Sequence, residues 1–188
     1  GTAALHLAVK SLDLPRGSKV LTTPITFAST NLVLLQEGLC PVFCDVQPKT
    51  GNLDLQSIKI KFSENPDVKA LILVHIAGYP CDMKNIQSFA DENNLPIIED
   101  CAHALGSSYR GDKVGSKNIC CFSFHPVKNM TCGDGGGVSC NDEVLASRLR
   151  SLSWYGCDTD TDQRIKADNN LWDYDIKEQG LKYHMNDI

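Results

Sequence analysis

Apolar positions along the first two thirds of the chain switch repeatedly between the period of a helix and that of a strand. Helical spacing recurs in three segments, residues 3–12, 28–37 and 83–93. Short apolar runs bounded by turn residues predict four strands, at residues 19–23, 41–46, 68–76 and 96–100. Because strands alternate with helices, we expect an α/β fold with a mainly parallel sheet between helices, and strands that are buried.

Shorter elements follow Asp100. A hairpin is expected at residues 107–115, around Arg110-Gly111-Asp112, and a buried strand at residues 119–124. Residues 138–140 predict a further strand, and a helix capped by Asn141 or Asp142 is expected to run to about Ser153. Residues 157–170 are polar and acidic, which is typical of a loop.

Composition narrows the class of protein. With 188 residues and 42% hydrophobic content, the chain is long enough for one domain with a sizeable core. The net charge of -5 gives no basic surface for nucleic acid or anionic lipid. No apolar run reaches the ~20 residues of a membrane span, and the first residues do not resemble a signal peptide. We therefore expect a cytoplasmic protein with no nucleic-acid or membrane partner.

Nine cysteines are scattered through apolar stretches, an odd number without paired CxxC spacing. This pattern favours reduced, buried thiols over a disulfide framework. Cys40 and Cys44 are compatible with a metal site and also with small buried residues on a strand, and the second interpretation is favoured.

Open parallel sheets bind ligands at the carboxyl ends of their strands, where Asp100, Ser123 and Lys128 are expected. A carboxylate there needs a cationic partner or hydrogen-bond donors, although Asp100 would also serve as a helix cap. Lys128 follows an aromatic strand and precedes a Gly-rich turn. An amine that is desolvated, or near another cation, is suited to Schiff-base chemistry, but a surface lysine remains an alternative.

Two segments could meet a phosphate. Gly1-Thr2-Ala3-Ala4 opens a helix, where free backbone N–H groups favour an anion, and Ser123 could add a donor; the alternative is an ordinary helix start with Thr2 as cap. The Gly-rich residues 133–137 precede a strand and lack a following GK[ST], so they are not a nucleotide loop. Close backbone approach to a neighbouring element is the favoured use.

Several ordered motifs together closely resemble the DegT/DnrJ/EryC1/StrS aminotransferases, which act on nucleotide-linked keto sugars. They are Glu99-Asp100-Cys101-Ala102-His103-Ala104-Leu105-Gly106, Phe122-Ser123-Phe124-His125-Pro126-Val127-Lys128-Asn129, Gly133-Asp134-Gly135-Gly136, Gly1-Thr2-Ala3-Ala4-Leu5, Thr23-Pro24-Ile25-Thr26-Phe27, Val74-His75-Ile76-Ala77-Gly78-Tyr79-Pro80 and residues 180–188. The resemblance covers essentially the whole chain.

That resemblance implies a cofactor, pyridoxal 5'-phosphate (PLP), and a set of catalytic and cofactor-binding residues. Lys128 forms the Schiff base with PLP, and Asp100 pairs with the pyridine nitrogen, which makes the ring an electron sink. The remaining cofactor-binding residues are implied as follows: Thr2, Ala3 and Ser123 contact the phosphate, Phe27 stacks on the ring, and His103 lies on the flank of the cofactor.

The implied fold is the aspartate-aminotransferase-like fold, fold type I, in which two subunits share the active site. Residues 1–188 are expected to form most of the PLP-binding large domain, cut at both ends and without the small carboxyl-terminal domain. A homodimer is implied. Lys182 stands where many relatives carry Asn, a residue that reaches the neighbouring subunit's cofactor or the substrate phosphates; a lysine keeps a phosphate contact as a point charge.

The implied reaction is transamination of a nucleotide-linked keto-deoxysugar, with glutamate as amino donor. A PLP-dependent sugar dehydratase on the same fold is an alternative, but there the family replaces the lysine by histidine. A catalytically silent regulator would be favoured by loss of Asp100 or Lys128, and both are present. A nicotinamide-binding Rossmann domain would need a strand-GxGxxG-helix unit, which the sequence lacks.

Overall fold

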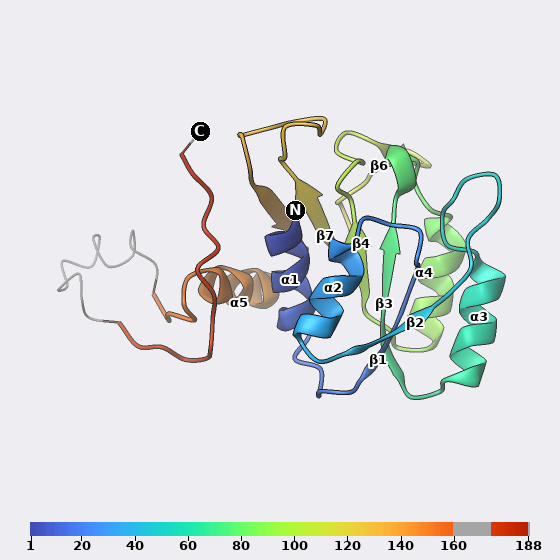
Figure 1. Cartoon of the computed structure of the whole chain (residues 1–188), viewed down its shortest axis with the longest axis horizontal. Coiled ribbons are helices and arrows are strands. Elements are labelled where there is room, and N and C mark those ends of the chain that lie inside the picture. The colour runs from blue at the N-terminus through green and yellow to red at the C-terminus, as the bar shows by residue number, and fades with distance from the viewer. Residues whose placement is uncertain (160–173, 188) are drawn as a thin grey trace.

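A six-stranded sheet with helices on both faces forms the centre of the molecule (Figure 1). The structure is a computed structural model that describes residues 1–159 and 174–187. The strands of this sheet are β1 (Lys19–Thr22), β2 (Cys40–Phe43), β3 (Val68–Val74), β4 (Ile97–Asp100), β7 (Ile119–Ser123) and β8 (Gly136–Ser139). Their order is β2-β1-β3-β4-β7-β8, and all neighbours are parallel except β7 and β8. The predicted α/β fold with a mainly parallel sheet is confirmed.

Two helices pack directly on each face of the sheet. The described helices are α1 (Thr2–Ser11), α2 (Ser29–Gln36), α3 (Leu55–Glu64), α4 (Met83–Glu92), α5 (Glu143–Ser153) and the 3-10 turn η1 (Ile76–Gly78). α1 and α2 pack on one face, α3 and α4 on the other, and α5 packs outside α1. The short hairpin of β5 (Ser108–Tyr109) and β6 (Asp112–Lys113) turns at Arg110 and Gly111, as predicted.

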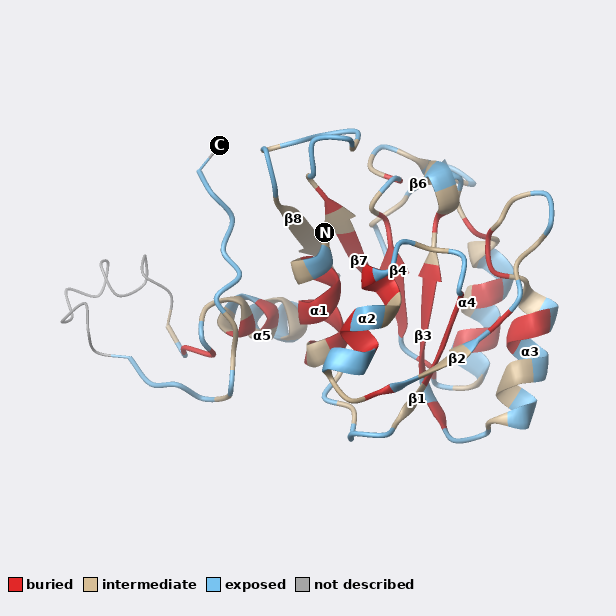
Figure 2. Ribbon diagram, in the orientation of Figure 1, coloured by how far each residue is buried: buried red, intermediate tan, exposed pale blue. Residues whose placement is uncertain are grey.

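Side-chain alternation along β3 explains this arrangement. Ala70 and Ile72 point to the core under α1 and α2, whereas Leu71 and Leu73 point to the core under α3 and α4. All four are fully buried, and Figure 2 shows β3 buried along most of its length. Burying a side chain the size of Leu stabilises the fold by about 1.5–3 kcal/mol. A strand buried on both faces is what the continuous apolar run predicted.

Two expectations from the sequence were incomplete or wrong. The strand predicted at residues 41–46 is the edge strand β2, which ends at Phe43, and Phe43 is 46% exposed instead of buried. Helix α3 was not predicted, because its apolar positions are interrupted by lysines and serines; Leu55, Ile58 and Phe62 are its contacts with the core. Its start carries a signal, since Asp54 accepts a hydrogen bond from the Ser57 amide.

The cysteines are free, and most are buried as expected. Cys44, Cys81, Cys101, Cys120, Cys121 and Cys157 lie in the interior. Cys40 is exposed on the edge strand, so the expectation of a buried residue was wrong there. Cys132 and Cys140 are half-buried. Within the described residues no helix is long and apolar enough to cross a membrane. The polar loop predicted at residues 157–170 lies mostly outside the described residues.

The antiparallel pair β7 and β8 depends on a glycine. A Cβ on Gly136 would lie 2.7 Å from the backbone nitrogen of Gly1 and 2.7 Å from the carbonyl oxygen of Phe122. The backbone nitrogen of Gly1 also donates to the carbonyl of Gly135 over 2.7 Å. The Gly-rich segment therefore allows α1 and β8 to approach closely, which is the use favoured from the sequence.

We expect Gly136→Ala to lower the free energy of unfolding by about 1–3 kcal/mol, because backbone atoms on two sides must move to admit the methyl group. The matched control is Gly137→Ala, whose Cβ would meet only the Phe124 ring at 3.5 Å, an ordinary contact. Urea titration of the full-length protein measures both changes. Equal losses in the two variants would contradict this account.

Candidate active site

A cavity of about 1280 Å³ opens where the carboxyl ends of β4 and β7 meet the first turn of α1. Seven of the eight site residues predicted from the sequence line it: Thr2, Ala3, Phe27, Asp100, Ser123, Lys128 and Lys182. The eighth, His103, contacts one of them directly. Residues far apart in the sequence are therefore brought together as expected, at the strand ends where parallel sheets bind ligands.

Asp100 is the last residue of β4 and is only 4% exposed. One carboxylate oxygen, Oδ2, accepts a hydrogen bond from Thr30 Oγ1 over 2.7 Å, and Oδ1 accepts from the backbone amide of Ala102 over 3.1 Å. The second bond closes a local turn; no helix begins directly after Asp100 in the described residues, so the alternative role of a helix cap is wrong. The two donors fix the orientation of the carboxylate while it lines the cavity.

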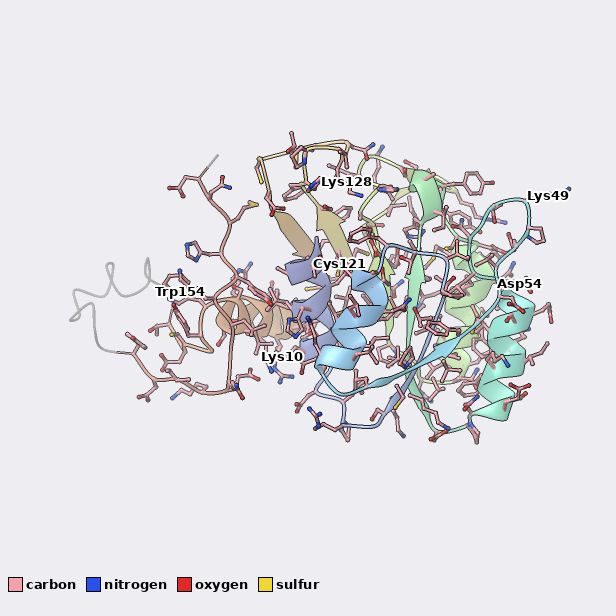
Figure 3. The ribbon with its side chains drawn as sticks, viewed as in Figure 1. Lys10, Lys49, Asp54, Cys121, Lys128 and Trp154 are labelled. Carbon is pink, nitrogen blue, oxygen red and sulfur yellow. The ribbon has the colours of Figure 1, made fainter. Side chains whose placement is uncertain are left out.

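Lys128 lies beyond the end of β7, in the loop between β7 and β8 (Figure 3). Its Nζ lies 2.5 Å from Nε2 of His103, so the amine is next to another basic group. The side chain is half-buried, so the expected desolvation is partial. One of the two nitrogens must act as acceptor, because two protonated groups cannot hydrogen bond to each other.

The turn at η1 packs against the backbone of His103. Gly78 has φ +81°, and a Cβ there would lie 2.5 Å from the His103 carbonyl oxygen. The carbonyl of Gly78 also accepts a hydrogen bond from Ser107 Oγ over 2.7 Å. This packing locks the turn that carries His103, and therefore helps to set the position of the Lys128 amine. Apart from Gly78 itself, no local pattern in the sequence indicates this support.

The start of α1 and the adjacent Ser123 form a place suited to an anion, here called the phosphate corner. The helix is capped by Gly1 without a side-chain hydrogen bond, so the alternative of Thr2 as cap is wrong. The first intrahelical bond runs from the Leu5 amide to the Gly1 carbonyl, which leaves the preceding amides without helical partners. Ser123 is adjacent, since a Cβ on Gly1 would lie 2.9 Å from its Oγ. Free amides, the helix dipole and a hydroxyl suit a phosphate.

Phe27 and Lys182 lie on other parts of the rim. Phe27 precedes α2, lines the cavity and is 78% exposed, so its ring is accessible to a flat ligand. Lys182 belongs to the segment 181–186, which runs beside the end of α5: the Leu181 amide donates to the Leu152 carbonyl over 2.7 Å. In the same segment the hydroxyl of Tyr183 contacts His6 Nδ1 at 3.1 Å.

A second group of ligand-type side chains, His75, Glu99 and Cys101, lies buried beside β4. His75 Nε2 and Glu99 Oε2 are 2.8 Å apart, and the ring's Nδ1 accepts from the Cys81 amide, so both ring nitrogens are engaged. Contact with the Cys120 thiol and burial raise the pKa of the Cys101 thiol well above its usual range. A protonated thiol beside a completed His–Glu hydrogen bond is a structural cluster and a poor metal site.

The residues around the cavity fit PLP. The cofactor needs a phosphate site, an acid for its ring nitrogen, a flat contact and an amine. Those four requirements are met in order by the start of α1 with Ser123, the buried Asp100, the exposed ring of Phe27 and Lys128. A carboxylate that is buried without a cationic partner in the described part of the chain is consistent with a protonated ligand nitrogen at this position.

Comparison with solved structures identifies the class. The chain matches the sugar aminotransferase CalS13 of Micromonospora echinospora with a TM-score of 0.84 and 37% identity, over 98% of this chain and 50% of that chain. It also matches DesI, solved in the presence of its TDP-sugar product, with a TM-score of 0.76 and 36% identity, over 82% of this chain and 39% of that chain. The fold is that of the PLP-dependent transferases, the aspartate-aminotransferase-like fold expected from the sequence.

Within that class, the chain belongs to the DegT/DnrJ/EryC1/StrS aminotransferase family, whose model matches residues 1–188. A curated relative, the spore coat polysaccharide biosynthesis protein SpsC of Bacillus subtilis, is 36% identical over all 188 residues. The match covers 100% of this chain and 48% of SpsC. The chain therefore spans about half the length of the curated relatives it matches.

Proposed function

We propose that the full-length protein is a PLP-dependent aminotransferase that acts on a nucleotide-linked keto-deoxysugar, with glutamate as amino donor. The observation that carries the proposal is the placement of Lys128, Asp100 and the phosphate corner in one cavity of a chain that belongs to this aminotransferase family. The TDP-sugar product of the structural relative DesI supports a nucleotide-linked substrate.

Each residue has a distinct part in this reaction. When bound, PLP supplies an electron-withdrawing ring on which an amino group can be exchanged. Asp100, fixed by Thr30 and the Ala102 amide, holds the proton on the ring nitrogen. Lys128 holds the cofactor covalently and, once released, its amine moves a proton at the substrate carbon. His103 is the group in contact with that amine and orients it.

The phosphate corner and Phe27 position these groups. The amides at the start of α1 and the hydroxyl of Ser123 bind the cofactor phosphate, and Phe27 covers the ring on its exposed side. Holding the reacting groups within hydrogen-bond reach removes much of the entropic cost of the reaction. A dehydratase remains the rival on this fold, and the lysine at position 128 argues against it.

The test is a single turnover with the amino donor alone. The full-length protein, loaded with PLP, should release one equivalent of 2-oxoglutarate per site from glutamate and lose its visible absorbance, because the amino group stays with the enzyme. A keto sugar linked to thymidine diphosphate should restore the absorbance. If bound PLP gave no oxo acid with glutamate or with any other amino acid, the chain would be a silent member of the fold.

We also propose that the full-length protein is a homodimer in which Lys182 approaches the site of the other subunit. The support is the exposed position of Lys182 on segment 181–186 at the rim of the cavity, together with the shared site that the family resemblance implies. Sedimentation equilibrium at micromolar concentration checks this directly. A monomer with full PLP occupancy would contradict it.

A further inference from the structure

A chain of two hydroxyl groups leads away from Asp100 to the loop before α2. Thr30 Oγ1 lies 2.7 Å from Asp100 Oδ2, and Thr26 Oγ1 lies 2.8 Å from Thr30 Oγ1. Thr30 is fully buried, and Thr26 is half-buried. Neither threonine lines the cavity, so neither touches a ligand bound there. Any effect of this chain on the reaction must therefore pass through Asp100.

The direction of the two hydrogen bonds follows from the hydrogens that are available. An ionised carboxylate has no hydrogen to give, so the Thr30 hydroxyl donates to Asp100 Oδ2. A hydroxyl has one hydrogen, and that of Thr30 is then used. The bond between the two threonines must therefore take its hydrogen from Thr26. Donation runs in one direction, from Thr26 to Thr30 to Asp100.

Other contacts fix the loop that carries Thr26. Asn31 on α2 donates to the carbonyl of Thr23 over 3.0 Å, and the Thr23 hydroxyl accepts from the Ile25 amide over 3.0 Å. The hydroxyl of Thr22, the last residue of β1, in turn donates to Asn31 over 3.0 Å. The loop is therefore tied both to β1 and to the first turn of α2, and the Thr26 hydroxyl keeps its place without depending on its own bond alone.

The charge of Asp100 depends on neutral donors. Within residues 1–159 and 174–187, no cation forms an ion pair with this carboxylate. Its partners are the Thr30 hydroxyl and the Ala102 amide. A hydroxyl that accepts a hydrogen bond becomes a stronger donor, so Thr26 strengthens the bond from Thr30. Donation to the ionised form stabilises it and makes the carboxylate less basic.

We propose that Thr26 is a positioning residue for the reaction, which polarises Thr30 and thereby keeps Asp100 ionised, so that the shared proton stays on the ring nitrogen of PLP. The inference rests on the proposed function, because it concerns a proton that the cofactor carries. Removal of the Thr26 hydroxyl weakens the bond from Thr30 and makes the carboxylate more basic, which draws the proton from the ring nitrogen toward Asp100. Thr26 also directly precedes Phe27, so one loop would influence both the stacking and the protonation of the ring.

The test observes that proton directly. The full-length protein is loaded with PLP that carries ¹⁵N at the ring nitrogen, whose NMR resonance differs between the protonated and the neutral ring. Thr26→Val should move this resonance toward that of the neutral ring and slow the single turnover with glutamate about two- to tenfold, the range of one neutral hydrogen bond. Thr26→Ser keeps the hydroxyl and should restore both. The control is Thr50→Val, at a half-buried threonine whose hydroxyl donates to Gln47 in another loop.

Three results would overturn the inference. The first is an unchanged resonance in Thr26→Val with PLP bound, which would make Thr26 a purely structural residue of the loop, even if the variant bound PLP less tightly. The second is a Thr26→Ser variant that behaves like Thr26→Val. The third is an unsubstituted protein that binds no PLP, which would overturn the proposed function as well. Failure of the proposed function alone is seen as bound PLP that yields no oxo acid from any amino acid; the resonance is read in that case too.

Discussion

Replacing Lys128 by alanine should abolish covalent capture of PLP and stop turnover. The amine both holds the cofactor and moves the proton, so its removal takes away the covalent step and the acid–base step together, and the acid–base step alone contributes about 100- to 10,000-fold. The phosphate corner, Phe27 and Asp100 remain, so free PLP should still bind. Borohydride reduction followed by peptide mapping of the full-length protein measures the covalent bond.

The matched control is Lys113→Ala. Lys113 is an exposed lysine on β6, away from the cavity wall, and its removal should leave the label on Lys128 unchanged. A reduced pyridoxyl group found on Lys113, Lys117 or Lys182 of the unsubstituted protein would show that Lys128 is not the attachment site. Chemical rescue of Lys128→Ala by a small amine would in turn support an acid–base role for the missing amine.

Asp100→Asn should leave the covalent bond to PLP intact and slow transamination at least about 100-fold, as loss of one well-placed electrostatic contact does in other enzymes. An amide is neutral and cannot hold the proton on the ring nitrogen in the way a carboxylate does. Thr30 can still donate to the amide oxygen, so the fold at the end of β4 is preserved. Single-turnover rates with glutamate measure the effect.

Two controls make the Asp100 result specific. Asp67→Asn changes a carboxylate that pairs with Lys19 over 3.0 Å on the far end of the sheet, and should have no effect on rate. Thr30→Val keeps the charge of Asp100 and removes the donor to Oδ2, so it should slow the reaction less than Asp100→Asn. Near-normal rates in Asp100→Asn would show that Asp100 has only a structural role, as the acceptor for the Ala102 amide.

The sequence was sufficient for the sheet and for the location of the site. The continuous apolar run at β3 indicates burial on both faces and therefore a parallel sheet. Asp100 and Ser123 end the strands β4 and β7 of that sheet. The edge position of β2 was not visible, because Val42 and Phe43 are as apolar as core residues and exposure depends on which strand pairs beyond them.

Contacts between distant segments could not be derived from one sequence. No local pattern links the residues in three of these contacts. They are Lys128 with His103, His103 with Gly78, and the cation–π contact of Lys182 with Trp154. The roles of the eight site residues came from resemblance to a family, and the structure adds only that seven of them line one cavity and that His103 contacts Lys128.

The joint between α1 and β8 links cofactor binding to folding. Gly1 and Gly135 are 134 positions apart, yet their backbones are hydrogen-bonded beside Ser123. The phosphate corner therefore exists only when the start of α1 has docked against the segment that leads into β8. An unfolded chain offers no such place to a phosphate. PLP should therefore act as a stabiliser as well as a reagent, adding about 2.7 kcal/mol to stability at a free concentration 100 times its Kd.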